Sequence, residues 1–94
     1  MNKTLLINRI NPNDLSKQKK KIFFLIGDMN LTQVEDKLIE TLKDSDFLEI
    51  DDIVYKYNGV ELSIDIQMIP VIVKLLSAKD LNIYSIHEIY DPEF

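Results

Sequence analysis

The chain has 94 residues, of which 46% are apolar, so it is long enough for one packed domain and too apolar for a disordered segment. Its net charge of −5 argues against nucleic acid as a partner, because binding phosphates requires many cations on one face. The absence of cysteine excludes disulfides, thiolate metal sites and cysteine nucleophiles.

The first part of the chain is predicted as an extension of the domain. Thr4–Ile10 is a candidate for a further short strand, and Asn11-Pro12-Asn13-Asp14 is a turn signal. The lysine-rich stretch Leu15–Lys21 is interpreted as a solvated linker, since the chain as a whole is acidic. No apolar run reaches the roughly 20 residues of a membrane span. We therefore expect no direct membrane insertion and, by default, a cytoplasmic location.

Lys21–Gly27 is predicted as a strand and is followed by a helix. The side chains from Ile22 to Ile26 are continuously apolar, which is typical of a strand that is covered on both faces or lies centrally in a sheet. Thr32 and Glu35 have the spacing of a capping box at the start of the helix. The apolar stripe of this helix consists of Leu31, Val34, Leu38, Ile39 and Leu42.

A hairpin is predicted from Phe47–Tyr57 and Val60–Ile66. The two strands flank Asn58-Gly59, a dipeptide preferred in type I′ turns because both residues tolerate a positive φ. This loop would pair three sets of apolar residues on one face: Tyr57 with Val60, Tyr55 with Leu62, and Ile53 with Ile64. It would pair Lys56 with Glu61, Val54 with Ser63, and Asp52 with Asp65 on the other face.

The last third of the chain predicts a helix and a final strand. Pro70 suits the first helical position, where its missing N–H costs nothing. The apolar stripe of this helix consists of Ile69, Ile72, Val73 and Leu76. Ile83–Tyr90 is the predicted strand, and neither of its faces is cleanly polar, so the sequence does not indicate which one meets the core.

The predicted order over Lys21–Tyr90 is strand–helix–strand–strand–helix–strand. With right-handed crossovers, this order predicts an α+β fold, the ferredoxin-like βαββαβ sandwich, in which two helices cover one face of a four-stranded antiparallel sheet. The other face is then free or available to a partner. We expect residues 21–94 to form this domain and residues 1–20 to form an N-terminal extension.

Chemistries that this fold supports elsewhere require side chains that are missing here. A metallochaperone needs a cysteine pair, and an acylphosphatase-like enzyme needs an arginine in the loop after the first strand, where Gly27–Leu31 has no cation. An RNA-recognition module needs aromatic and basic residues on the third strand, where the sequence has Glu61, Ser63 and Asp65.

Metal binding and catalysis are not expected either. His87 is the only histidine, and its neighbour Glu88 would point to the opposite face of a strand. The acidic residues near the second strand lack the spacing of a calcium loop and are interpreted as a solvated edge: Asp44, Asp46, Glu49, Asp51 and Asp52. We therefore predict a domain with no catalytic residues, no metal and no cofactor.

The run Ile69-Pro70-Val71-Ile72-Val73-Lys74-Leu75-Leu76, followed by Leu81-Asn82-Ile83-Tyr84-Ser85-Ile86-His87-Glu88, resembles a known tail domain. It is similar to the C-terminal accessory domain of bacterial ABC-transporter ATP-binding subunits of the drug and bacteriocin export type. The chain departs from that family in ending with Asp91-Pro92-Glu93-Phe94 and in lacking a nucleotide-binding domain. The resemblance implies a transporter-associated accessory role and transfers no catalytic residue.

Two functions remain open from the sequence. The first is a non-catalytic accessory domain that contacts another protein or a second copy of itself, with Tyr55, Tyr84 and Tyr90 as candidate contact residues because tyrosine is favoured at interfaces. The alternative is a regulatory domain of the amino-acid-sensing (ACT-like) type. Its ligand would lie at Gly27, Asp28 and Thr32, since free amides at a helix start favour an anion.

Overall fold

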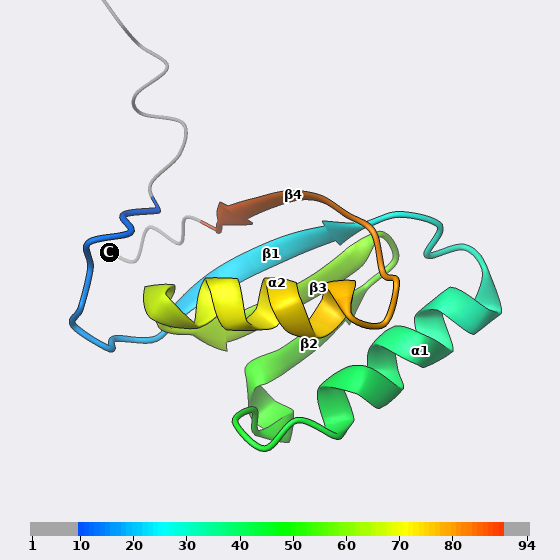
Figure 1. Cartoon of the computed structure of the whole chain (residues 1–94), viewed down its shortest axis with the longest axis horizontal. Helices are drawn as coiled ribbons and strands as arrows, with labels where there is room; N and C mark the ends of the chain where they lie inside the picture. Colours follow the sequence, from blue (N-terminus) through cyan, green and yellow to red (C-terminus); the bar gives the residue numbers. More distant parts are fainter. Residues whose placement is uncertain (1–9, 90–94) are drawn as a thin grey trace, which may run out of the picture.

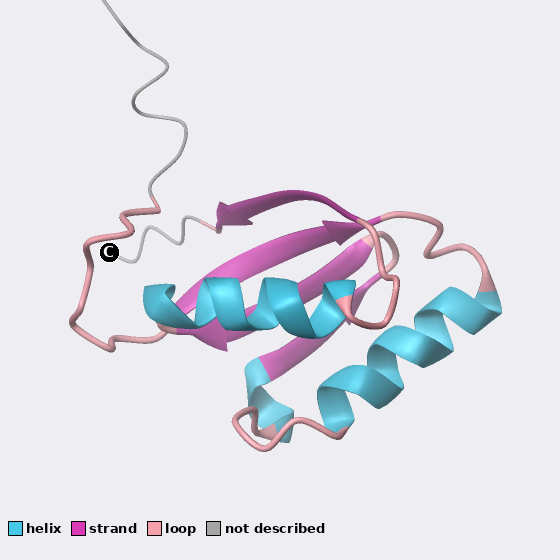
Figure 2. Cartoon of the chain, viewed as in Figure 1, coloured by secondary structure: helices cyan, strands magenta, loops and turns pink. Residues whose placement is uncertain are grey.

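The structure of the protein is a computed structural model that describes residues 10–89. These residues contain four strands and two α-helices. Figure 2 distinguishes helices, strands and loops by colour. In chain order these are β1 (Lys20–Ile26), α1 (Thr32–Lys43), β2 (Ile53–Lys56), β3 (Gly59–Ile64), α2 (Ile69–Ser77) and β4 (Ile83–Glu88). Short 3-10 turns, η2 (Ile50–Asp52) and η3 (Ile66–Met68), precede β2 and α2.

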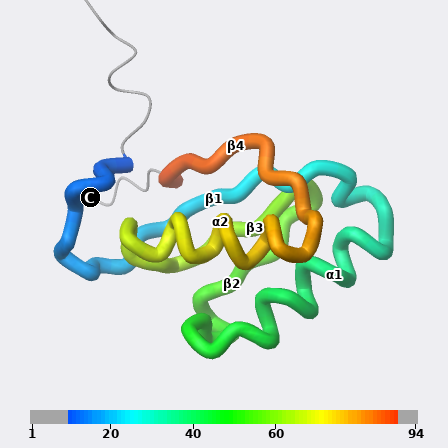
Figure 3. The backbone as a smooth tube through the Cα atoms, in the orientation of Figure 1, coloured from blue at the N-terminus to red at the C-terminus, as the bar shows by residue number. Residues whose placement is uncertain are grey.

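The four strands form one antiparallel sheet in the order β2-β3-β1-β4 (Figure 1). The predicted α+β architecture, a four-stranded antiparallel sheet with two helices, is thereby confirmed. The backbone passes from β1 through α1 to the β2 edge, and from β3 through α2 to the β4 edge (Figure 3). Consequently β1 and β3 are central strands, whereas β2 and β4 are the edges.

One core lies between the helices and one face of the sheet. Alternate residues of the central strands supply the sheet side, as the period of a strand requires. These residues are Ile22, Phe24, Ile26, Val60, Leu62 and Ile64. The helices supply Leu38 and Leu42 from α1 and Ile72 and Leu76 from α2, all of which are fully buried. Both predicted helical stripes are therefore confirmed in their central residues.

The hairpin has the predicted faces but a different loop. The loop consists of Tyr57 and Asn58, neither of which has a positive φ, and Gly59 is already the first residue of β3. The predicted Asn58-Gly59 turn is therefore wrong. A Cβ atom at Gly59 would overlap the carbonyl oxygen of Phe24 on β1, so glycine is needed here for close strand approach rather than for the turn.

The register of this hairpin differs from the predicted one by an even number of residues. Ile53 pairs with Leu62, Val54 with Glu61, and Tyr55 with Val60. Because side chains alternate with a period of two, this shift leaves every side chain of β2 on its predicted face. The predicted pairing of Asp52 with Asp65 is wrong, since Asp65 instead accepts a hydrogen bond from the N–H of Met68 (3.1 Å) at the start of η3.

The predicted starts of helix α1 and of strand β2 are also wrong. The capping box of Thr32 and Glu35 does not form, because Leu31 is the N-cap residue and Thr32 already belongs to α1. The preceding turn explains this: Asp28 has a φ of 61° and its carbonyl accepts from the N–H of Leu31 (3.0 Å). The strand predicted from Phe47 begins only at Ile53, because η2 interrupts it.

The final strand contacts the core through an irregular register. Ile86 pairs with Phe24 and Ile83 with Ile26, and a bulge lies between these two pairs. As a result both isoleucines pack against the core, although their odd spacing would place them on opposite faces of a regular strand. Tyr84 is the additional residue at the bulge, and its side chain is exposed.

Residues 10–19 pack along the domain. Ile10 contacts the core, and the side-chain amide of Gln67 donates to the carbonyls of Pro12 (2.8 Å) and Asp14 (3.0 Å). Two lysines of the predicted linker form ion pairs, Lys19 with Asp52 (3.0 Å) and Lys20 with Asp14 (3.2 Å). The candidate strand Thr4–Ile10 lies, except for Ile10, outside the described residues.

Candidate protein-interaction surface

Exposed apolar side chains gather beside the β2 edge. Nine large apolar residues of the described chain are exposed, and five of them lie between residues 47 and 57. These five are Phe47, Ile50, Val54, Tyr55 and Tyr57. Ile50 is 85% exposed and Tyr57 is 90% exposed, so neither contributes much to the core. Concentrated exposed apolar surface of this kind is typical of a site that contacts another molecule.

An apolar cleft lies within this region, and we call it the β2 cleft. Its cavity volume is about 370 Å³, and α1, β2 and the intervening segment form its walls. The lining residues are Ile39, Leu42, Lys43, Leu48, Ile50, Ile53 and Tyr55. Partial burial raises the pKa of the Tyr55 phenol above its ordinary value of 10.0.

The backbone beside the β2 cleft is the free edge of the sheet. β2 pairs only with β3 among residues 10–89, so alternate N–H and C=O groups of β2 point away from the sheet. The N–H of Ile53 donates to the carbonyl of Ile50. Tyr55, two residues further along, forms no backbone hydrogen bond outside the β2–β3 pair within the described chain. A polar strand edge and an apolar cleft therefore lie side by side.

Acidic side chains continue this surface along α1. Asp36, Glu40 and Asp44 follow one another at a spacing of four residues, and with Ile39 and Lys43 they line a second cleft of about 500 Å³, which we call the α1 cleft. Ile39 and Lys43 line both clefts, so the two adjoin. Like charges at this spacing destabilise a helix by about 0.2–0.5 kcal/mol per pair. The Asp36–Glu40 pair therefore destabilises the free helix, and Lys37 and Lys43, each three residues from Glu40, offset part of this effect.

Asp52 holds the segment before β2 in place. Its carboxylate accepts from the N–H of Glu49 (3.0 Å) and from the ammonium of Lys19 (3.0 Å), and the N–H of Asp52 donates to the carbonyl of Glu49 (2.9 Å). The Glu49 hydrogen bond, and then Lys19, lower the pKa of Asp52 against the opposing effect of burial. These contacts keep Ile50 at the surface instead of in a longer strand.

The predicted contact tyrosines do not lie together. Tyr55 lines the β2 cleft, whereas Tyr84 lies on β4 at the opposite edge of the sheet. Tyr90 lies outside the described residues. The β2 cleft therefore unites one predicted contact residue with Ile39, Leu48 and Ile50, which sequence reasoning missed. The sequence signal that could have indicated these residues is the mixture of apolar and acidic side chains over Phe47–Asp52.

The predicted ligand residues lie outside the clefts at β2 and α1. Gly27 donates its N–H to the carbonyl of Asn82 (2.9 Å), and the ring of Tyr84 lies against it so closely that a Cβ at Gly27 would approach the ring to 2.5 Å. Asp28 and Thr32 are exposed in the turn and at the start of α1. Neither of the two adjoining clefts at β2 and α1 includes these three residues.

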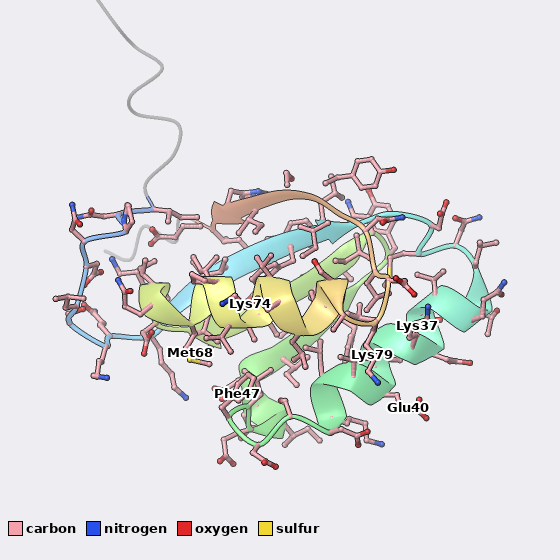
Figure 4. The ribbon with its side chains drawn as sticks, viewed as in Figure 1. Lys37, Glu40, Phe47, Met68, Lys74 and Lys79 are labelled. Carbon is pink, nitrogen blue, oxygen red and sulfur yellow. The ribbon has the colours of Figure 1, made fainter. Side chains whose placement is uncertain are left out.

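Two further clefts are more polar. One lies between the C-terminal ends of the helices, where Lys37 and Glu40 of α1 approach Lys79 beyond α2 (Figure 4), and its volume is about 420 Å³. The other lies between α2 and β4 and includes Ser77 and Asn82. Opposite charges lie close together in the first of these clefts, and neither contains a concentration of exposed apolar residues like that near β2.

The face of the sheet opposite the helices carries the single histidine. The rings of His87 and Phe23 lie 5.4 Å apart with an interplanar angle of 49°. Across residues 10–89, no three His, Asp or Glu side chains come together as a metal site would require. Neither described helix has the length and apolar character to cross a bilayer.

Comparisons with protein-family models, with curated proteins and with solved structures find no match to this chain.

Proposed function

We propose that this chain is a non-catalytic protein-interaction domain of the ferredoxin-like type, which binds its partner through the β2 cleft and the adjoining strand edge. The observation that carries the proposal is an apolar cleft lined by the exposed side chains of Ile50 and Tyr55, within a segment (residues 47–57) that contains five of the nine exposed large apolar residues described. A sheet edge next to such a cleft offers main-chain hydrogen bonds and a pocket for a side chain, which together recognise a peptide segment.

The connectivity supports the ferredoxin-like assignment. The chain order β1-α1-β2-β3-α2-β4 and the sheet order β2-β3-β1-β4 place each helix in a crossover between parallel strands that have one strand between them. In this arrangement both helices share a core with one face of the sheet, as Leu38 and Ile72 do here.

We further propose that the partner belongs to a bacterial export transporter. The resemblance to the accessory domain of ATP-binding subunits rests on α2 and β4, whose residues Ile72, Leu76 and Ile86 contribute to the core. These segments pack in the core, and within residues 10–89 no strand other than β3 pairs with β2 at the opposite edge. An accessory domain acts by contact with its partner, so the proposal requires no catalytic side chain from this chain.

Calorimetry and NMR test the proposal directly. The isotopically labelled chain is titrated with the ATP-binding subunit of a drug-export or bacteriocin-export transporter from the same organism. We expect the amide signals of Ile50 and Tyr55 to shift. We expect Ile50→Ser to weaken binding by about tenfold or more, because burying an isoleucine contributes about 1.5–3 kcal/mol.

Leu15→Ser is the matched control, because Leu15 is also exposed (74%) and lies outside both clefts. Equal binding by the Ile50→Ser and Leu15→Ser variants would show that the β2 cleft is not the contact surface. Signal changes confined to β4 would lead to the same conclusion.

A further inference from the structure

We infer that the β2 edge accepts an extended segment of another protein that carries both large apolar and basic side chains. This inference rests on the proposed function and specifies the chemistry of the partner. The segment adds to the sheet beside β2, places an apolar side chain in the β2 cleft, and places lysine or arginine side chains against the α1 cleft.

The strand edge provides the main-chain contacts. Tyr55 is central in β2 and, within residues 10–89, has no backbone hydrogen bond outside the β2–β3 pair. In an antiparallel ladder, residues two apart on one strand direct their N–H and C=O groups to the same side. The N–H of Ile53 donates to Ile50 and not to β3, so the N–H and C=O of Tyr55 also point away from β3. A segment that lies beside β2 can therefore accept from the Tyr55 N–H and donate to its carbonyl.

The β2 cleft provides the apolar contact. Side chains of an added strand project alternately to the two faces of the sheet, so every second one points toward the α1 side. There it meets Ile39, Ile50 and Ile53 in the β2 cleft. Val54, which is 43% exposed, offers a smaller apolar contact on the opposite face.

The charge around the clefts selects basic side chains. The α1 cleft has three carboxylates, Asp36, Glu40 and Asp44, against Lys43, while Lys37 and Lys79 approach Glu40 from the neighbouring cleft. Three further acids, Asp46, Glu49 and Asp51, lie in the exposed segment that leads to β2. None of these six forms an ion pair with another residue of 10–89. Lysine or arginine on the partner offsets this repulsion, whereas an acidic segment increases it.

The same charges disfavour a second copy as the occupant. A symmetric pair through β2 would bring together two chains that each carry a net charge of −5, with Lys56 of each copy as the only cation in the paired strands. A flexible basic segment follows the edge and both clefts without this repulsion.

Three short peptides test the inference by NMR titration of the full chain. The basic probe alternates valine and lysine, the acidic probe replaces lysine with glutamate, and the polar probe replaces valine with serine. We expect the basic probe to shift the amides of Ile50, Ile53 and Tyr55 and to slow hydrogen exchange at Tyr55. We expect the other two probes to bind at least about tenfold more weakly, since each lacks one of the two contributions.

Matched variants separate the apolar contribution to probe binding from the electrostatic one. Ile50→Ser should weaken the basic probe about tenfold, whereas the control Leu15→Ser should not. Glu40→Lys should weaken it about threefold and reduce its dependence on salt, whereas Glu35→Lys, on the same helix but outside both clefts, should have a smaller effect.

The outcomes distinguish the partner chemistry from the function. Equal binding of the acidic or polar probe at Tyr55 would overturn the inferred chemistry and would leave the β2 edge as the interaction surface. Absence of any shift at β2 with the basic probe would also overturn the inference. Light scattering that shows a dimer abolished by Ile50→Ser would identify a second copy as the occupant. Transporter binding that is insensitive to Ile50→Ser would refute the proposed function itself.

Discussion

Substitution of Asp52 and Lys19 tests whether the segment before the domain holds the interaction surface in place. Asp52 is the last residue of η2, directly before β2, and 33 positions separate it from Lys19. Its two carboxylate oxygens have separate partners: Lys19 contacts Oδ1 and the N–H of Glu49 contacts Oδ2. Asp52→Asn removes the charge and retains most of the shape. Lys19→Met removes only the ion pair.

The exposure of the Lys19 side chain limits how much its ion pair with Asp52 contributes to the free energy of unfolding. Two unit charges 3.0 Å apart interact by about 1.4 kcal/mol in water. The Lys19 side chain is 61% exposed, so the measured contribution should lie near the 0.2–1 kcal/mol of exposed pairs, at about 0.5 kcal/mol. The hydrogen bond from Glu49 is charge-assisted, and asparagine keeps part of it. We therefore expect Asp52→Asn to lower the free energy of unfolding by about 1 kcal/mol, which is about 4–8 °C in Tm.

The stabilisation that the Asp52 carboxylate provides should decrease as the pH falls. The folded-state pKa of Asp52 lies below its ordinary value of 3.8, mainly through the Glu49 hydrogen bond and then through Lys19. A lowered carboxyl pKa stabilises the fold above the unfolded-state pKa, and this stabilisation is lost as the pH falls through the folded-state pKa. Wild type and Asp52→Asn should thus differ fully at pH 7 and converge as the pH falls below 3.8 and through the lowered folded-state pKa of Asp52.

Urea unfolding followed by circular dichroism measures these differences. The double variant should show a coupling free energy of about 0.5 kcal/mol between Lys19 and Asp52. Lys17→Met serves as the control, because Lys17 forms no ion pair with the other residues of 10–89. An Asp52→Asn difference that stayed constant from neutral to acidic pH, or a coupling energy indistinguishable from zero, would refute the reasoning.

Two further predictions concern packing. Gly59→Ala should destabilise the fold by about 1–3 kcal/mol because its Cβ would overlap the rigid backbone of Phe24, whereas Gly27→Ala should cost less because the exposed Tyr84 ring can move; thermal unfolding compares the two. Leu38→Ala should cost about 2–5 kcal/mol because Leu38 is fully buried, whereas Ile50→Ser should change stability by less than about 0.5 kcal/mol because Ile50 is 85% exposed. Equal losses for Leu38→Ala and Ile50→Ser would mean that Ile50 serves the fold and not a partner.

Most of the architecture could be predicted from local patterns. The continuous apolar run of β1 indicated a central strand, and β1 indeed lies between β3 and β4. The helical stripes indicated the buried faces of α1 and α2, since a period of 3.6 residues is visible without tertiary information. The hairpin faces were also predicted correctly, because an even shift in register preserves them.

Two of the incorrect predictions concern residues whose partners lie far away in the sequence, whereas the capping box at Thr32 fails because of the local turn at Asp28. Asn58-Gly59 has the local preference of a turn, but Gly59 lies in β3 because Phe24 of β1 leaves no room for a side chain. The strand predicted from Phe47 is interrupted at η2, where the carboxylate of Asp52 binds the N–H of Glu49 and the ammonium of Lys19. Local propensity cannot reveal the contacts with Phe24 and Lys19. The β2 cleft depends on this interruption, which explains why Tyr55 was identified from the sequence and Ile50 was not.

The central position of β1 has a consequence for biosynthesis. Phe24 pairs with Val60 and with Ile86, 36 and 62 positions later. A nascent chain therefore cannot complete the sheet around β1 until β4 has left the ribosome, and contacts of such long range form slowly. During that interval the apolar run Ile22–Ile26 has an unpaired edge, a template for self-association. Variants that weaken β4 should consequently be lost to aggregates in the cell.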